Sequence, residues 1–111
     1  MITVAEIKEK LKLELHTGEG LSERKADGCY IGDLLSLAMS KVQAGNVWIT
    51  IQTNINIAAV ASLTDAACII IADGFVPDDS TVNKANAQDI IIMSSEMSAY
   101  ELAIKLSEMG I

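Results

Sequence analysis

Two short stretches of the chain are apolar at every position, ACIIIA (67–72) and IIIM (90–93). A strand with one face in water alternates apolar and polar residues, whereas a strand buried on both faces does not. Doubly buried strands are typical of parallel sheets, whose neighbouring strands are joined by helices that cover the sheet. The two stretches therefore predict the centre of a parallel sheet with helices on both sides.

The segment NVWITIQTNINIAAVASL (46–63) adds a further strand and a helix to this sheet. Its first half alternates like a strand, and its second half is apolar almost all round, like a buried helix. Apolar periodicity predicts strands over 11–15, 28–31, 47–52, 67–72 and 90–93, and helices over 4–11, from 34 to Gly45, 55–64, 80–87 and from 99. This order predicts an α/β fold: one domain over residues 1–111, built as a three-layer α/β/α sandwich with a mostly parallel sheet.

The helix ends carry recognisable signals. Thr3 with Glu6, and Ser98 with Glu101, match the capping-box pattern. Asp33 is expected to cap the second helix, which Gly45 would end in a left-handed conformation.

Charge and composition narrow the class of partner. The chain has 8 basic and 15 acidic residues, which gives a net charge of −7. Nucleic acid and anionic membranes repel such a chain, so we expect neither as a partner. No apolar run spans a bilayer and the first residues lack a signal-peptide pattern, so we expect a cytoplasmic protein. Apolar residues make up 50% of the chain, and this surplus in a small domain favours a homodimer.

The residues that usually bind metals or perform redox chemistry are few. Cys29 and Cys68 form no C-x-x-C pair, and His16 is the only histidine. We therefore expect no disulfide framework, no metal site and no cofactor. Neither Ser94 nor Ser95 has a neighbouring base in the sequence, which argues against a serine nucleophile.

Polar loops follow three of the predicted parallel strands and meet at one edge of the sheet, where ligands bind in such folds. The candidate ligand-binding residues are Thr50, Gln52, Thr53, Asn54, Asp73, Gly74, Ser94 and Ser95. The loops contain acidic but no basic residues, so we expect that no polyphosphate binds there. The alternative is structural: Thr53 or Asn54 caps a helix, and Asp73-Gly74 forms a turn.

Three residues are candidates for a dimer interface, Trp48, Ala58 and Ala61. Trp48 shares a strand face with polar side chains, so either a helix of the same chain covers it or it anchors a partner. Helix 55–64 has almost no polar face, and its small alanines would let a second subunit approach in a two-fold dimer. The alternative is that a neighbouring helix of the same chain covers this face.

Several of these segments together resemble the DRTGG domain, a family similar in fold to the N-terminal domain of HPr kinase/phosphorylase. They are the helix and strand of TVAEIKEKLKLELHTGEGL, the strand–turn–helix ITIQTNINIAAVA, the glycine turn of IIIADGFVP and the serine-rich helix entry SSEMSAYELA. The resemblance covers nearly the whole chain. The family commonly has a Thr-Gly-Gly type turn after its fourth strand, where this chain has Ala72-Asp73-Gly74-Phe75.

The resemblance implies an accessory role, because DRTGG domains accompany phosphotransacetylases, CBS-containing pyrophosphatases and kinases, and also stand alone. It implies a non-catalytic regulatory or protein-interaction module that acts beside a partner metabolic enzyme. One alternative is a metabolite sensor that binds a neutral or cationic small molecule at the loops after the strands. Another is a small enzyme in which Asp73 or a different carboxylate acts as acid or base.

Overall fold

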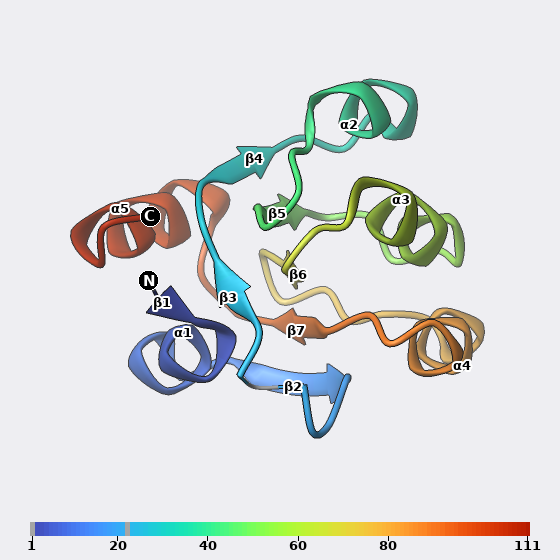
Figure 1. Ribbon diagram of the computed structural model, residues 1–111, viewed down its shortest axis with the longest axis horizontal. Coiled ribbons are helices and arrows are strands. Elements are labelled where there is room, and N and C mark those ends of the chain that lie inside the picture. The colour runs from blue at the N-terminus through green and yellow to red at the C-terminus, as the bar shows by residue number, and fades with distance from the viewer. Residues whose placement is uncertain (1, 22) are drawn as a thin grey trace.

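The structure, a computed structural model, describes residues 2–21 and 23–111. In chain order its elements are β1 (Ile2–Thr3), α1 (Val4–Leu11), β2 (Glu14–Thr17), β3 (Lys25–Ala26), β4 (Cys29–Ile31), α2 (Leu35–Lys41), β5 (Val47–Thr50), α3 (Asn56–Thr64), β6 (Cys68–Ile71), α4 (Asp79–Ala87), β7 (Ile92–Ser94) and α5 (Ala99–Glu108). They form three layers, with α1 and α5 on one face of the main sheet and α2, α3 and α4 on the other (Figure 1). The predicted three-layer α/β/α sandwich is confirmed.

The main sheet has five strands in the order β2-β7-β6-β5-β4. Strands β4 to β7 are parallel, and β2 is antiparallel to β7 at one edge. The prediction that the strands within 47–52, 67–72 and 90–93 are parallel and adjacent is confirmed. Since each parallel pair needs a right-handed crossover and the strand order advances in one direction, α2, α3 and α4 all fall on the same face.

The central strand β6 explains why its sequence is apolar throughout. Ile69 and Ile71 pack against the α2–α4 face, whereas Cys68 and Ile70 pack against the α1/α5 face. All four side chains are buried. A strand covered on both sides has no position at which a polar residue would meet water.

The boundaries of β7 and β2 differ from the prediction for local reasons, and β5 ends at Thr50 rather than at residue 52. β7 covers Ile92–Ser94 rather than 90–93, because Asp89 adopts a left-handed conformation (φ 58°) and the Ile90 amide still bonds Ala85 O at the end of α4. β2 begins at Glu14 rather than at residue 11, because Leu11 is the last residue of α1. The two-residue strands β1 and β3, which pair antiparallel, were too short to give a sequence signal.

Both predicted capping boxes are present, in α1 and α5. The prediction that Asp33 caps α2 is wrong: α2 starts at Leu35, its N-cap residue is Leu34, and no side chain caps it. Gly45 does not end this helix either, since α2 ends at Lys41. Gly45 has φ 84° but lies in the turn before β5.

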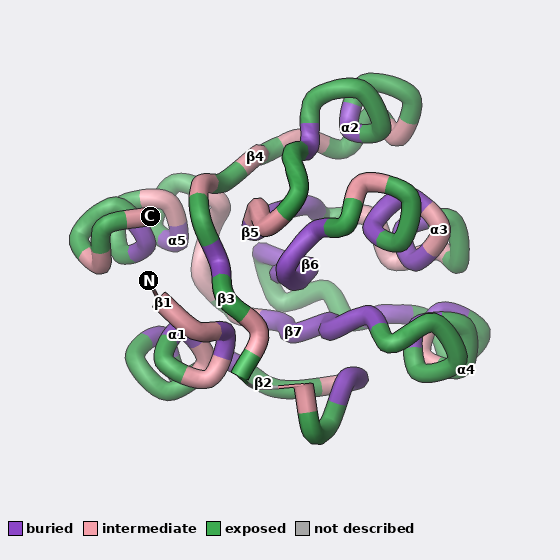
Figure 2. The backbone as a smooth tube through the Cα atoms, in the orientation of Figure 1, coloured by how far each residue is buried: buried purple, intermediate pink, exposed green. Residues whose placement is uncertain are grey.

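The three predicted interface residues lie inside the chain. Trp48, Ala58 and Ala61 are completely buried, and the Trp48 indole N–H donates to Gly32 O at 3.0 Å. The interface role predicted for them is therefore wrong, because α2 and α4 flank α3 and cover it within the same chain. Figure 2 shows buried positions of α3 facing the sheet and exposed positions facing outward. Self-association itself stays a prediction.

Candidate functional site

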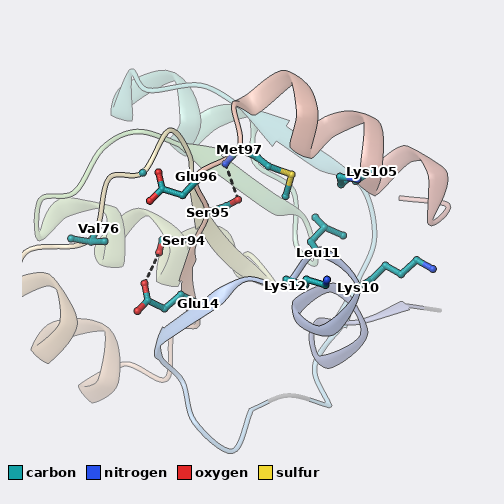
Figure 3. A pocket seen from close by; sticks show the side chains of 11 residues that line it. Lys10, Leu11, Lys12, Glu14, Val76, Ser94, Ser95, Glu96, Met97 and Lys105 are labelled. Carbon is teal, nitrogen blue, oxygen red and sulfur yellow. Dashed lines mark hydrogen bonds between the residues drawn. The ribbon is translucent and has the colours of Figure 1, made fainter.

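A pocket of about 530 Å³ opens where the carboxyl ends of β6 and β7 meet the α1/α5 layer (Figure 3). It is bounded by the end of α1, the start of β2, the loop after β6, the loop after β7, and α5. The residues that line it are Lys10, Leu11, Lys12, Glu14, Gly74, Val76, Ser94, Ser95, Glu96, Met97 and Lys105. Its volume is in the range of small-molecule sites, and its place at the carboxyl edge of a parallel sheet is typical of them.

The structure divides the eight predicted ligand-binding residues into two groups. Gly74, Ser94 and Ser95 line the pocket. The other five, which are Thr50, Gln52, Thr53, Asn54 and Asp73, do not line it. The predicted site is therefore shifted along the sheet edge, from β5 and β6 toward β6, β7 and β2.

The polar side chains after β5 are bonded to one another and to the loop after β4. Thr50 Oγ1 donates to Asp33 Oδ1 at 2.8 Å, and Gln52 Nε2 donates to Asp33 O at 2.9 Å. Asn54 Nδ2 donates to Gln52 Oε1 at 2.8 Å, while Asn54 Oδ1 accepts from the Asn56 amide at 2.9 Å. These contacts support the structural alternative for this loop, since its donors and acceptors hold the loop and the start of α3.

The loop after β6 forms a tight turn against the loop after β7. Asp73 (φ 60°) and Gly74 (φ 79°) both have positive φ, and the Phe75 amide bonds Ala72 O, as in a type I′ turn. The Asp73 amide donates to Met97 O and the Gly74 amide to Ser95 O, each at 2.9 Å. The predicted Asp73-Gly74 turn is confirmed, and together the two loops form one wall of the pocket.

Ser94 has a histidine beside it that the sequence did not reveal. His16 Nε2 lies 2.7 Å from Ser94 Oγ, although the residues are 78 positions apart. Antiparallel pairing of β2 with β7, which places Glu14 opposite Ser94, brings them together. Ser94 therefore has a base beside it in the fold, although it has none nearby in the sequence.

This serine and histidine nevertheless lack the arrangement of a nucleophilic relay. In a Ser-His-Asp triad the carboxylate holds the ring nitrogen that faces away from the serine. Here Glu14 Oε2 lies 3.6 Å from the same nitrogen, His16 Nε2, that faces Ser94, and 3.4 Å from Ser94 Oγ. Ser94 is also almost fully buried. The three side chains form a polar cluster at the pocket wall.

Lysines line the part of the pocket that lies opposite Glu14 and Ser94. Lys10 and Lys12 come from the end of α1, and Lys105 comes from the last turn of α5. Among residues 2–21 and 23–111 the ion pairs are His16–Glu14 and Arg24–Asp65, so none of these lysines is paired there. The expectation that no polyphosphate binds at this edge was based on the charges of the loops alone. It missed these cations because only tertiary packing brings the α1/α5 layer to the sheet edge.

The two cysteines lie outside this pocket and stay protonated. Cys29 is exposed, and partial desolvation by neighbouring atoms raises the pKa of its thiol to about 11. Burial, with a smaller contribution from the nearby Cys29, raises the pKa of Cys68 to about 12 against the opposing effect of Arg24. Both thiols are free. A thiolate nucleophile at neutral pH is therefore disfavoured.

Two absences hold for the described residues. No cluster of three or more His, Cys, Asp or Glu side chains there is placed to hold a metal ion. None of the helices described above has the length and apolar character needed to cross a bilayer.

Comparison with known proteins gives a likeness of fold. No protein-family model and no curated protein matches the sequence. The structure is similar to that of the CBS and DRTGG domains of the regulatory region of Clostridium perfringens pyrophosphatase, which was crystallised with its activator, diadenosine tetraphosphate. The TM-score is 0.72 at 12% sequence identity, and the match covers 90% of this chain but only 44% of the pyrophosphatase chain. The chain therefore has a DRTGG-like α/β fold.

Proposed function

We propose that this chain is a non-catalytic regulatory module that binds a small molecule in the pocket at the carboxyl edge of its sheet. The observation that carries the proposal is the pocket itself, which has lysines without ion-pair partners in the described chain and serine hydroxyls on its walls. Ser94, on the pocket wall, is paired with His16, and in the described chain no carboxylate holds the ring nitrogen of His16 that faces away from Ser94. Such a pocket is suited to binding, and it offers no nucleophile that is activated for turnover.

The similar pyrophosphatase region supports a regulatory role. That region is regulatory, and the structure contains an activator. By analogy of fold we propose that this chain acts beside a metabolic enzyme and changes the activity of that enzyme when its own ligand binds.

A protein-interaction role is favoured by a second observation. Large apolar side chains are exposed on the loops and helix starts at the same edge of the sheet, namely Leu34, Ile51, Ile55, Phe75 and Val76. Exposed apolar residues that gather in one region are typical of protein interfaces. We propose that this edge contacts either the partner enzyme or a second copy of the chain in a homodimer, close enough to the pocket for the two events to be coupled.

Ligand binding can be tested by thermal unfolding with a panel of metabolites, followed by NMR mapping of each stabilising compound. A true ligand should raise the unfolding temperature and shift the amides of Gly74, Ser95, Glu96 and Met97. A panel without any stabilising compound, or shifts confined to another surface, would contradict the proposal.

Self-association is tested separately by sedimentation equilibrium. The homodimer predicts twice the chain mass of 11.8 kDa, reduced to a folded monomer when Leu34 and Phe75 are both replaced by aspartate. A wild-type monomer at micromolar concentration would eliminate the homodimer and leave the partner enzyme as the occupant of this edge.

A further inference from the structure

We infer that the pocket accepts a dipolar small molecule, a nucleoside monophosphate whose base carries an amino group. The inference rests on the proposed ligand-binding role and names the class of ligand. Figure 3 shows the two kinds of charge at different parts of the pocket. Glu14 and Glu96 lie with Ser94 on one side, and Lys12 and Lys105 lie on the other.

The lysine side supplies an anion site. Lys12 follows α1 in a left-handed conformation (φ 55°), and Lys105 is in the last turn of α5. Neither has an ion-pair partner in the described chain, so both ammonium groups are free to meet a phosphate. Figure 3 shows Lys10 extending away from the serines, so the inference does not depend on it. Hydrogen bonds between ammonium and phosphate are charge-assisted and therefore stronger than neutral ones.

The carboxylate side favours a ligand that offers a hydrogen-bond donor. Ionised carboxylates only accept hydrogen bonds, and the Glu96 carboxylate lies against the Gly74 backbone, where an added Cβ would be 2.6 Å from Oε2. A ligand with phosphates at both ends would be repelled here, and the net charge of −7 adds to that repulsion. An amino group at this end satisfies the carboxylates and excludes purely anionic compounds.

Two apolar side chains also line the pocket, Leu11 and Met97. Figure 3 shows Met97 between Lys105 and Glu96, and Leu11 beside the lysines. A methionine thioether makes favourable contacts with aromatic rings. A nucleoside monophosphate therefore matches the side chains along the pocket. The amino group of its base would lie at the glutamates, and its phosphate would lie at the lysines.

The first test is a set of NMR titrations with three probes: AMP, adenosine and inorganic phosphate. AMP should shift the amides of Gly74, Ser95, Glu96 and Met97 and bind at least about tenfold more tightly than either of the other two. Equal affinity for AMP and phosphate would reduce the pocket to an anion site and overturn the inference. No response to AMP at millimolar concentration would also overturn it. If another compound of the metabolite panel still binds in this pocket, the proposed function survives and only the ligand class fails.

Matched variants test each end of the ligand. Lys105→Gln should lower the affinity for AMP about tenfold without changing the affinity for adenosine. Lys84→Gln is the control, since Lys84 is also in the last turn of its helix but on the opposite face of the sheet. Glu96→Gln should lower the affinity for AMP, because the amino group of the base loses a charged acceptor. The same variant should raise the affinity for inorganic phosphate, because it removes a repulsive carboxylate. Equal effects of Lys105→Gln and Lys84→Gln, or weakening of both AMP and phosphate by Glu96→Gln, would contradict the assigned orientation.

Discussion

Asp33 Oδ1 accepts a hydrogen bond from Thr50 Oγ1 at 2.8 Å, and the same oxygen accepts the Ile51 amide at 2.8 Å. Thr50 is the buried last residue of β5, whereas Asp33 lies in the loop after β4. One carboxylate oxygen therefore ties together two loops at the carboxyl edge of the sheet. The residue that the sequence assigns to a helix cap instead fixes the neighbouring strand.

Replacing Asp33 with alanine should lower the free energy of unfolding by about 1–3 kcal/mol, because Thr50 Oγ1–H loses its acceptor in a buried position. Urea denaturation measures this change. Asp27→Ala is the control, since the Asp27 carboxylate makes no hydrogen bond or ion pair within the described chain, and it should stay within about 0.5 kcal/mol of wild type. Equal losses for the two variants would show that the Asp33–Thr50 contact is energetically neutral.

The purified chain should not hydrolyse activated esters or phosphate monoesters above the buffer rate. Glu14 and Ser94 meet His16 at the same ring nitrogen, so the ring is not oriented for general-base catalysis. Assays with p-nitrophenyl acetate and p-nitrophenyl phosphate measure this directly. Turnover that disappears in Ser94→Ala, or in Asp73→Asn, would identify an enzyme and refute the prediction.

Stability should fall in alkali through Cys68, whose pKa burial raises from 9.0 to about 12. Between these values the unfolded thiol has lost its proton and the folded thiol has not. The unfolded state therefore binds fewer protons, and the free energy of unfolding decreases as pH rises, by at most about 1.4 kcal/mol per pH unit. The contribution is fully present below the unfolded pKa and is lost as pH rises toward the folded pKa.

Cys68→Ala isolates this contribution when both proteins are unfolded by urea at several pH values. The stability difference between wild type and variant should be constant near neutral pH and should shrink above pH 9. Parallel curves throughout the alkaline range would show that Cys68 ionises equally well in the folded chain.

Ala58→Glu should unfold the chain or cost more than about 3 kcal/mol, because it places a charged and larger side chain in a fully buried position. Leu63→Glu is the matched change on the same helix. Leu63 is 73% exposed, so this variant should retain nearly wild-type stability. Circular dichroism melting separates the two results. A folded Ala58→Glu monomer that has lost a wild-type dimer would restore the interface role of α3.

Gly74→Ala and Gly20→Ala should each cost about 1–2 kcal/mol, since both glycines have left-handed φ values, 79° and 91°. The two sites differ in space: a Cβ added at Gly74 would lie 2.6 Å from Glu96 Oε2, whereas a Cβ added at Gly20 would meet no atom of the described residues, its chain neighbours aside, within 4 Å. NMR spectra should therefore change at Ser95 and Glu96 in Gly74→Ala alone. Unchanged amides there would mean that the Glu96 side chain moves aside without disturbing the pocket wall.

The architecture was predictable because it depends on periodicity, which is local in sequence. The doubly apolar strands β6 and β7 specify a covered parallel sheet, and the capping boxes at Thr3 and Ser98 place the starts of α1 and α5. Trp48 was harder to place, because a strand pattern shows that its face holds polar neighbours and does not show which helix covers them. α2 and α3 pack over it, with Gly32 O as the acceptor for its indole.

The site was only partly predictable because its residues come from opposite ends of the chain. Ser94 ends β7 and Gly74 lies in the loop after β6, so the rule that ligands bind at the carboxyl edge of a parallel sheet finds both. Glu14, Lys12 and Lys105 reach the same pocket through the antiparallel edge strand β2 and through the α1/α5 layer. Neither strand direction nor helix packing is encoded in a local pattern, so the charge of the pocket could not be read from its loops.

The distribution of helix caps has a consequence for how the chain opens. Reciprocal side-chain caps hold the first turns of α1 and α5, whereas the described N-termini of α2 and α4 show no side-chain cap hydrogen bond. Uncapped first turns fray at a lower free energy than capped ones. Amide hydrogen exchange should therefore be slower at the starts of α1 and α5 than at the starts of α2 and α4. The layer that carries the pocket lysines would then stay closed during fluctuations that open the opposite layer.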